Sequence, residues 1–174
     1  MVRMIRSIGQ LNAATRDEFI AALGGIFEHS PWVADGAWDL KPFAGVPDLH
    51  ARMCAVVRLS PHARQLALLR AHPELAGRAM VSNALTTESA DEQTRSGLTR
   101  CSPEELATLQ ALNAAYHRKF GWPFIAAVKH LDRASIIKLF TERLETNAAD
   151  EFENCLANIE KITRWRLVDQ VQEG

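Results

Sequence analysis

The chain of 174 residues lacks the features that mark several common classes of protein. Basic residues are not in excess, because 20 Lys and Arg face 21 Asp and Glu and leave a net charge of -1. This balance argues against a general nucleic-acid-binding protein. No apolar run approaches the roughly 18 residues of a membrane-spanning helix, and the first residues lack the apolar core of a signal peptide. We therefore expect a protein that binds neither nucleic acid nor membrane.

Cysteine and metal-binding patterns are also scarce. Cys54, Cys101 and Cys155 lie far apart and form no C-x-x-C pair, which argues against a disulfide framework or a cysteine-rich zinc site. The six histidines include no pair four residues apart that could hold a metal from one helix face. Residues 171–174 form no peroxisomal tripeptide. We expect no metal site and a cytoplasmic location.

The sequence has none of the common cofactor or hydrolase signatures: no G-x-G-x-x-G, P-loop, H-E-x-x-H or G-x-S-x-G. It also has no alternating apolar and polar run of the kind that half-buried strands show. Alanine and leucine, which favour helices, dominate its 47% of apolar residues. We predict an all-α, single-domain helical bundle of about seven to nine helices, spanning residues 1–174.

Helix starts are visible as capping patterns. Three capping boxes are predicted, in which a Ser or Thr is followed three residues later by Glu: Thr15–Glu18, Ser89–Glu92 and Ser102–Glu105. Single caps are predicted at Asp48, Asp132 and Asn147.

His72 is the histidine with the most defined surroundings. Pro73 disfavours helical geometry in the residue before it, so a helix should finish at His72. The negative end of that helix favours a protonated ring, which suits a general acid. The alternative is a histidine that only caps the last carbonyl groups of the helix, and spacing alone favours this structural role.

Glu92 also has a structural alternative. As the fourth residue of the predicted box Ser89–Glu92, its carboxylate would reach back to the backbone N–H of Ser89. Spacing alone favours this structural role over a chemical one.

Arg166 continues an apolar stripe of the last helix, formed by Phe152, Cys155, Ile159 and Ile162. Arg164 projects from a different face, where water is accessible. An arginine that points toward the core needs an anionic partner, because an unpaired buried charge is costly. The alternative is that the stem of Arg166 snorkels and its head group reaches water.

Several segments together resemble the OHCU decarboxylase family (2-oxo-4-hydroxy-4-carboxy-5-ureidoimidazoline decarboxylases), which completes the conversion of urate to allantoin. They are His72–Gly77 (HPELAG), the run 85–98 that contains ESADEQ, and NAAYHRKFGWPFIAAV over 113–128. Phe27–Trp32, Arg143-Leu144 and Arg166-Leu167 also match the family pattern. The resemblance covers about Leu11 to Val168.

This resemblance implies a homodimeric, all-helical enzyme that decarboxylates OHCU to (S)-allantoin without a metal or an organic cofactor. It makes His72 and Glu92 the catalytic pair, and it leaves open which of them delivers the proton. It also implies a group of substrate-binding residues: Pro73, Ser89, Gln93, Phe124, Ile125, Ala126, Ala127, Val128 and Arg166. Two other functions compete with this one, namely a catalytically silent helical interaction module and a metal-dependent hydrolase that uses scattered histidines.

Overall fold

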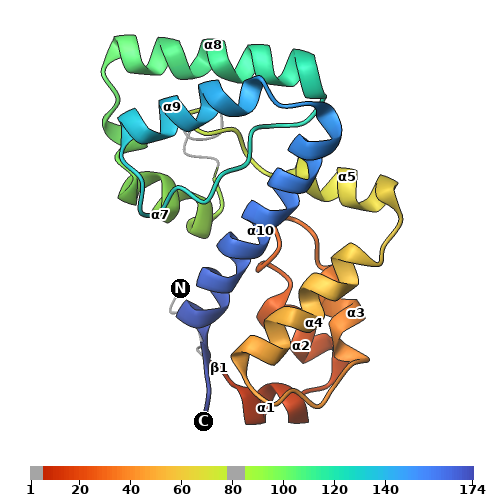
Figure 1. Ribbon diagram of the computed structural model, residues 1–174. Helices are drawn as coiled ribbons and strands as arrows, with labels where there is room; N and C mark the ends of the chain where they lie inside the picture. The colour runs from red at the N-terminus through yellow and green to blue at the C-terminus, as the bar shows by residue number, and fades with distance from the viewer. Residues whose placement is uncertain (1–5, 78–84) are drawn as a thin grey trace. The chain divides into compact units, whose positions relative to one another are not determined.

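A computed structural model describes residues 6–77 and 85–174 and shows a mostly helical chain (Figure 1). Within those residues it has nine α-helices, one short 3-10 turn and two two-residue strands. The α-helices are α1 (Ile8–Ala13), α2 (Arg16–Leu23), α3 (Trp32–Trp38), α4 (Val46–Arg58), α5 (His62–Ala71), α7 (Thr87–Arg95), α8 (Pro103–Phe120), α9 (Arg133–Leu144) and α10 (Ala148–Gln170). The 3-10 turn η1 is Leu98–Arg100, and the strands are β1 (Arg6–Ser7) and β2 (Val171–Gln172). The predicted all-α class and helix number are confirmed.

The chain forms two compact units that share α10. One unit runs to Ala71 and resumes at Glu160–Gly174, and the other is His72–Ile159. Whether the whole chain behaves as the single domain expected over residues 1–174 stays a prediction. No helix within the described ranges is long and apolar enough to cross a membrane.

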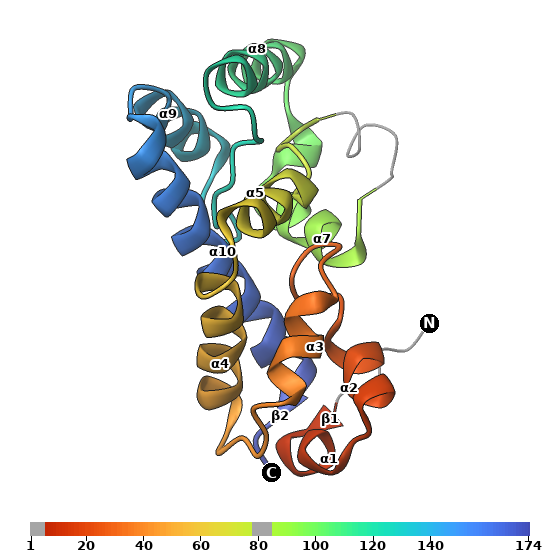
Figure 2. The ribbon, with the colours of Figure 1, turned by 90° about the vertical axis from the view of Figure 1, so that its right-hand side faces the viewer.

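The first unit is built on α2, α3 and α4, which pack side by side in sequence order (Figure 2). Its core contains Phe19, Leu49 and Met53, all fully buried. Gly36 permits the close approach of α3 to α4, since a Cβ atom there would lie 2.8 Å from Val56 Cγ1. The short parallel strands β1 and β2 join the two ends of this unit, with Arg6 opposite Val171.

The second unit contains an aromatic core between α8 and α9. Phe124 stacks on Phe140 with ring centroids 3.9 Å apart, and Tyr116 meets both rings edge-on. Each such aromatic pair contributes about 0.5–1.5 kcal/mol beyond the apolar area that it buries. Gly121 ends α8 in a left-handed conformation (φ 79°), which lets the chain turn back toward this core.

Most of the predicted helix caps are present. Thr15 and Ser102 form complete capping boxes with Glu18 and Glu105, and Asp132 accepts from the N–H of Ser135 at the start of α9. The predicted Asp48 cap is wrong, because α4 begins two residues earlier at Val46. The N–H of Val46 is bonded instead by the carboxylate of Glu173, 127 residues away.

Candidate active site

His72 directly follows the last residue of α5 and precedes Pro73, so the helix ends one residue before the predicted end. The side chain is 7% exposed and its Nε2 atom is buried. The negative end of α5 attracts a positive charge at this place, whereas burial of the ring disfavours one.

The backbone after this histidine is held by two buried amide side chains. Gln93 of α7 accepts a hydrogen bond from the N–H of Ala76 at 2.9 Å and donates to the carbonyl of Glu74 at 3.4 Å. Asn113 of α8 donates to the carbonyl of Leu75 at 2.8 Å. Ala76 adopts a left-handed conformation (φ 51°), which costs an L-residue about 1–2 kcal/mol. The two amides therefore fix a strained turn.

Glu92 does not form the predicted capping box. The helix α7 begins at Thr87, and the side chain of Thr86 accepts from the N–H of Ser89 as the N-cap. Glu92 consequently lies in the second turn, beyond the four N–H groups that a helix start leaves open. Ser89 and Gln93 are buried on the same face of the helix, and Glu92 is half-buried beside them.

The structure thus brings one group of predicted site residues together. Because Gln93 is bonded to the turn that follows His72, the helix that carries Glu92 adjoins the segment that carries the histidine. Both belong to the unit His72–Ile159. Gln93 was predicted to bind substrate, but both ends of its side-chain amide form hydrogen bonds with the backbone of this turn.

The segment Phe124–Val128 lies in the same unit and has neither helix nor strand geometry. Its side chains are buried, with Ala127 half-buried. The Phe124 ring stacks on Phe140, and the guanidinium carbon of Arg143 lies 4.4 Å from its centroid. The ring therefore packs within the core of this unit.

Two polar side chains hold the backbone of this segment. Arg143 of α9 donates to the carbonyl of Ile125 at 2.6 Å, and Asn158 of α10 accepts from the N–H of Ala127 at 3.0 Å. Neither residue is predicted from the sequence to have a role in the site. The signal for Arg143 was present, since it continues the buried stripe of Ile136 and Phe140 just as Arg166 continues its own stripe.

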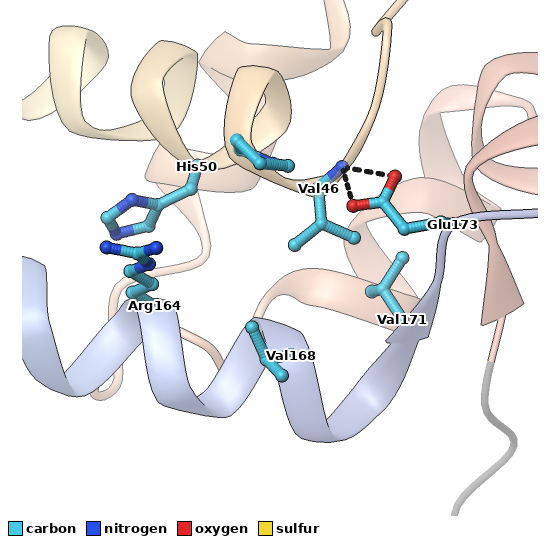
Figure 3. A pocket seen from close by; sticks show the side chains of 7 residues that line it. Val46, His50, Arg164, Val168, Val171 and Glu173 are labelled. Atoms are coloured by element: carbon cyan, nitrogen blue, oxygen red, sulfur yellow. Dashed lines mark hydrogen bonds between the residues drawn. The ribbon is translucent and has the colours of Figure 1, made fainter.

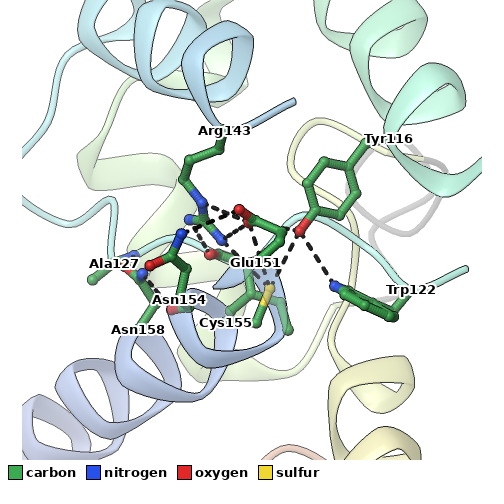
Figure 4. A network of polar contacts seen from close by, with 9 residues as sticks. Tyr116, Trp122, Ala127, Arg143, Glu151, Asn154, Cys155 and Asn158 are labelled. Carbon is green, nitrogen blue, oxygen red and sulfur yellow. Dashed lines mark hydrogen bonds and ion pairs between the residues drawn. The ribbon is translucent and has the colours of Figure 1, made fainter. Parts of the chain in front are cut away.

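Arg143 itself belongs to a buried polar network in which its guanidinium and the Tyr116 hydroxyl converge on Glu151 (Figure 4). Its Nη2 atom lies 2.5 Å from Glu151 Oε1, and Glu151 is fully buried. Burial raises the pKa of Tyr116 and that of Cys155 above their usual values, so both are protonated at neutral pH and can donate to Glu151.

Arg166 lies on the buried stripe, as predicted: it is 3% exposed, whereas Arg164 is exposed. The alternative in which its head group reaches water is therefore wrong. Its Nη1 atom donates to Glu28 Oε2 at 2.9 Å and to the carbonyl of Ile26 at 3.1 Å. The anion that this arginine needs is thus supplied by Glu28, which is 1% exposed, inside its own unit. A role of Arg166 in substrate binding stays a prediction.

A separate cavity of about 270 Å³ lies in the unit that contains Arg166 (Figure 3). It is lined by Val46, Pro47, His50, Arg164, Val168, Val171 and Glu173, and of these only Arg164, the alternative to Arg166, was considered as a substrate-binding residue. Burial lowers the pKa of His50, whose Nε2 atom lies 3.1 Å from Thr163 Oγ1. The ring is therefore neutral at physiological pH.

A histidine and a carboxylate are the residue types that acid–base catalysis uses most often, and the structure places His72 and Glu92 on adjoining elements of one unit. Among the residues that the structure describes, no group of three His, Cys, Asp or Glu side chains could hold a metal ion.

Comparison with known proteins identifies the family. The family model for OHCU decarboxylase matches residues 12–168, and the chain belongs to this family. The 2-oxo-4-hydroxy-4-carboxy-5-ureidoimidazoline decarboxylase of Mus musculus is 36% identical over 160 residues, which cover 92% of this chain and 90% of the mouse protein. The enzyme of the same name from Halalkalicoccus jeotgali is 37% identical over 161 residues, 92% of this chain and 89% of that protein.

Solved structures show the same fold. A crystal structure of (S)-allantoin synthase aligns with a TM-score of 0.76 and 26% identity over 96% of this chain, which spans only 54% of that protein. A crystal structure of OHCU decarboxylase in the presence of (S)-allantoin aligns with a TM-score of 0.65 at 19% identity, covering 88% of this chain and 96% of the other.

Proposed function

We propose that the protein decarboxylates OHCU to (S)-allantoin, the last step from urate to allantoin. Family membership over residues 12–168 supports this reaction, as do relatives named for it that match about nine-tenths of their own length. One observation in the structure carries the assignment of the site. The buried His72 is followed by a turn that Gln93 ties to α7, the helix of Glu92.

The substrate explains why two acid–base residues suffice. Its carboxylate is attached to a carbon that also bears a hydroxyl group and neighbours a C=N bond. When CO2 leaves, the electron pair of the broken C–C bond flows into the C=N bond, so the substrate provides its own electron sink. The proposed reaction therefore uses neither a metal nor an organic cofactor.

His72 would supply the proton that sets the stereochemistry, and Glu92 would orient His72 or accept the hydroxyl proton. The opposite assignment, in which Glu92 supplies this proton and His72 accepts the hydroxyl proton, is compatible with the same arrangement. A positioned acid or base contributes about 10²–10⁴-fold to such a step. The negative end of α5 supports His72 as the donor, because it stabilises the protonated ring.

Substrate binding would use Pro73, Ser89 and the segment Phe124–Val128, which all belong to the unit His72–Ile159. A substrate-binding role of Arg166 is a separate prediction, because its guanidinium is bonded to Glu28 in its own unit. The buried apolar side chains of the segment would exclude water from the reacting carboxylate. Gln93 would contribute by holding the turn after His72, since both ends of its amide contact that backbone. The resemblance to the family further supports a homodimer, and a cytoplasmic location is part of the same proposal.

The experiment that tests the activity uses freshly generated OHCU, whose decay is followed by absorbance with and without the purified protein. We expect acceleration that is unchanged after treatment with a chelator. A decay rate equal to the spontaneous rate would rule the decarboxylase out, and a loss of activity in chelator would instead favour a metal-dependent enzyme. Sedimentation of the same sample tests the homodimer.

A further inference from the structure

The buried backbone of the segment Phe124–Val128 needs hydrogen-bond partners from elsewhere in the chain. Buried backbone N–H and C=O groups need hydrogen-bond partners, and a segment without helix or strand geometry has no ladder to supply them. Arg143 donates to the carbonyl of Ile125, and Asn158 accepts from the N–H of Ala127. Arg143 of α9 and Asn158 of α10 therefore form hydrogen bonds with the backbone of the segment at two positions, two residues apart.

Each of the two side chains is itself held in place. The Nε atom of Arg143 donates to Glu151 Oε1 at 2.7 Å, and the same guanidinium lies over the Phe124 ring. Glu151 also accepts from the hydroxyl of Tyr116 at 2.8 Å (Figure 4). Asn158 donates its Nδ2 to the carbonyl of Asn154, one turn earlier in α10, at 2.8 Å. Arg143 and Asn158 are therefore each oriented by further hydrogen bonds when they contact the segment.

A buried ion pair is a poor way to gain stability alone. Desolvation of both charges offsets most of their attraction, and apolar residues of similar volume often stabilise a core equally well. Arg143 and Glu151 are 8% and 0% exposed in their side chains, so they bear this desolvation cost. What apolar residues cannot do is hydrogen-bond a backbone carbonyl, and this is the contact that Arg143 makes with Ile125.

We propose that Arg143 and Asn158 are positioning residues that set the backbone conformation of Ile125–Ala127 in the substrate pocket, with Glu151 orienting Arg143. This inference rests on the proposed function, because it takes that segment as part of the pocket. Neither side chain contacts the reacting atoms in this proposal; both act through the backbone that they hold.

The test uses Asn158→Leu, which removes the acceptor for Ala127 at similar volume. The control is Asn12→Leu in the other unit, since Asn12 is also half-buried and grips a loop backbone in the same way. It donates to the carbonyl of Phe43 at 3.0 Å and accepts from its N–H at 2.8 Å. Each variant is measured for kcat and KM with OHCU, for melting temperature, and for hydrogen exchange at the backbone amides.

For Asn158→Leu we expect about a tenfold fall in kcat/KM, carried mainly by KM, together with faster exchange of the Ala127 amide. Asn158→Asp, which keeps the acceptor oxygen, should recover most of that loss. Asn12→Leu should lower the melting temperature by a similar amount without changing KM. If Asn158→Leu does not fold, Arg143→Lys serves instead, because it keeps a charge toward Glu151 but loses the planar fork; it should raise KM in the same way.

Equal kinetic losses in Asn158→Leu and Asn12→Leu would overturn the proposal, since both would then report general destabilisation. An unchanged KM with an unprotected Ala127 amide would overturn it too. Failure of the proposed function is a different result: the wild-type protein would then leave OHCU decay at its spontaneous rate. In that case the amide exchange of Ala127 still tests whether Asn158 holds the segment.

Discussion

Replacing Glu92 by glutamine separates a chemical role from a structural one. Glutamine keeps the length and shape of the side chain and removes only its charge and its ability to accept a proton. If Glu92 capped a helix, glutamine would serve nearly as well, because it also occurs in capping boxes. The structure removes that role, since α7 starts at Thr87 and its N-cap is Thr86.

The expected effects on stability and on kcat follow from the places of Glu92 and Thr86 in α7. Glu92 is half-buried in the second turn of α7, and glutamine has nearly the same shape. Glu92→Gln should therefore change the free energy of unfolding by less than about 0.5 kcal/mol. The loss of an acid–base group should lower kcat by about 10²–10⁴-fold. Thr86→Ala provides the opposite pattern: it removes the observed cap and should cost about 1 kcal/mol. For a chain of this length that is a fall of about 2–4 °C in melting temperature.

The assay combines steady-state decarboxylation of OHCU with a thermal melt of both variants. We expect Glu92→Gln to melt like the wild type and to be nearly inactive, and Thr86→Ala to melt earlier and keep kcat within about twofold. Wild-type turnover by Glu92→Gln would refute a chemical role of Glu92. Activity that falls only in proportion to a lowered melting temperature would refute it as well.

Three further predictions follow from other parts of the molecule. Arg166→Lys should lower kcat/KM about 10–150-fold and also lower the melting temperature, because the buried contact with Glu28 is weakened, whereas Arg164→Lys should change little; the reverse order would mean that the substrate-binding arginine is misassigned. Acidification below about pH 5 should lower the melting temperature, because backbone N–H groups at helix starts lower the pKa of Glu105 and Asp132: the folded state then binds fewer protons than the unfolded state, and this stability is lost as the pH falls through the carboxyl range. A melting temperature that rises on acidification would contradict this. Burial raises the pKa of the Cys54 thiol to about 12, so at pH 8 only about one molecule in 10⁴ carries its thiolate; thiol labelling should spare Cys54 until the protein is unfolded, and rapid labelling found by mass spectrometry would disagree.

Local signals predicted much of the fold. The caps at Thr15, Ser102 and Asp132 depend on hydrogen bonds that span three residues, so the sequence contains all of the information. The start of α7 was misplaced because two capping patterns overlap there, one from Thr86 and one from Ser89. Both are locally reasonable, and the structure has the cap from Thr86.

Long-range partners could not be predicted in the same way. The stripe pattern correctly showed that Arg166 is buried, but its partner Glu28 is 138 residues away. The cap of α4 comes from Glu173, at a separation of 127 residues. The hydrogen bond from Arg143 to the carbonyl of Ile125 was not predicted, because it also joins two different elements. The apolar stripe of α9 could have predicted only that this arginine is buried.

The most direct test of the central claim follows the chirality of the product made by His72→Asn. Asparagine fits the end of α5 but cannot deliver the proton, so the variant should keep the helicity and melting temperature of the wild type. Freshly generated OHCU is added to each protein, and circular dichroism follows the allantoin that forms. We expect a single enantiomer from the wild type. From His72→Asn we expect the spontaneous rate and a racemic product. Fast formation of one enantiomer by His72→Asn would show that another group delivers the proton.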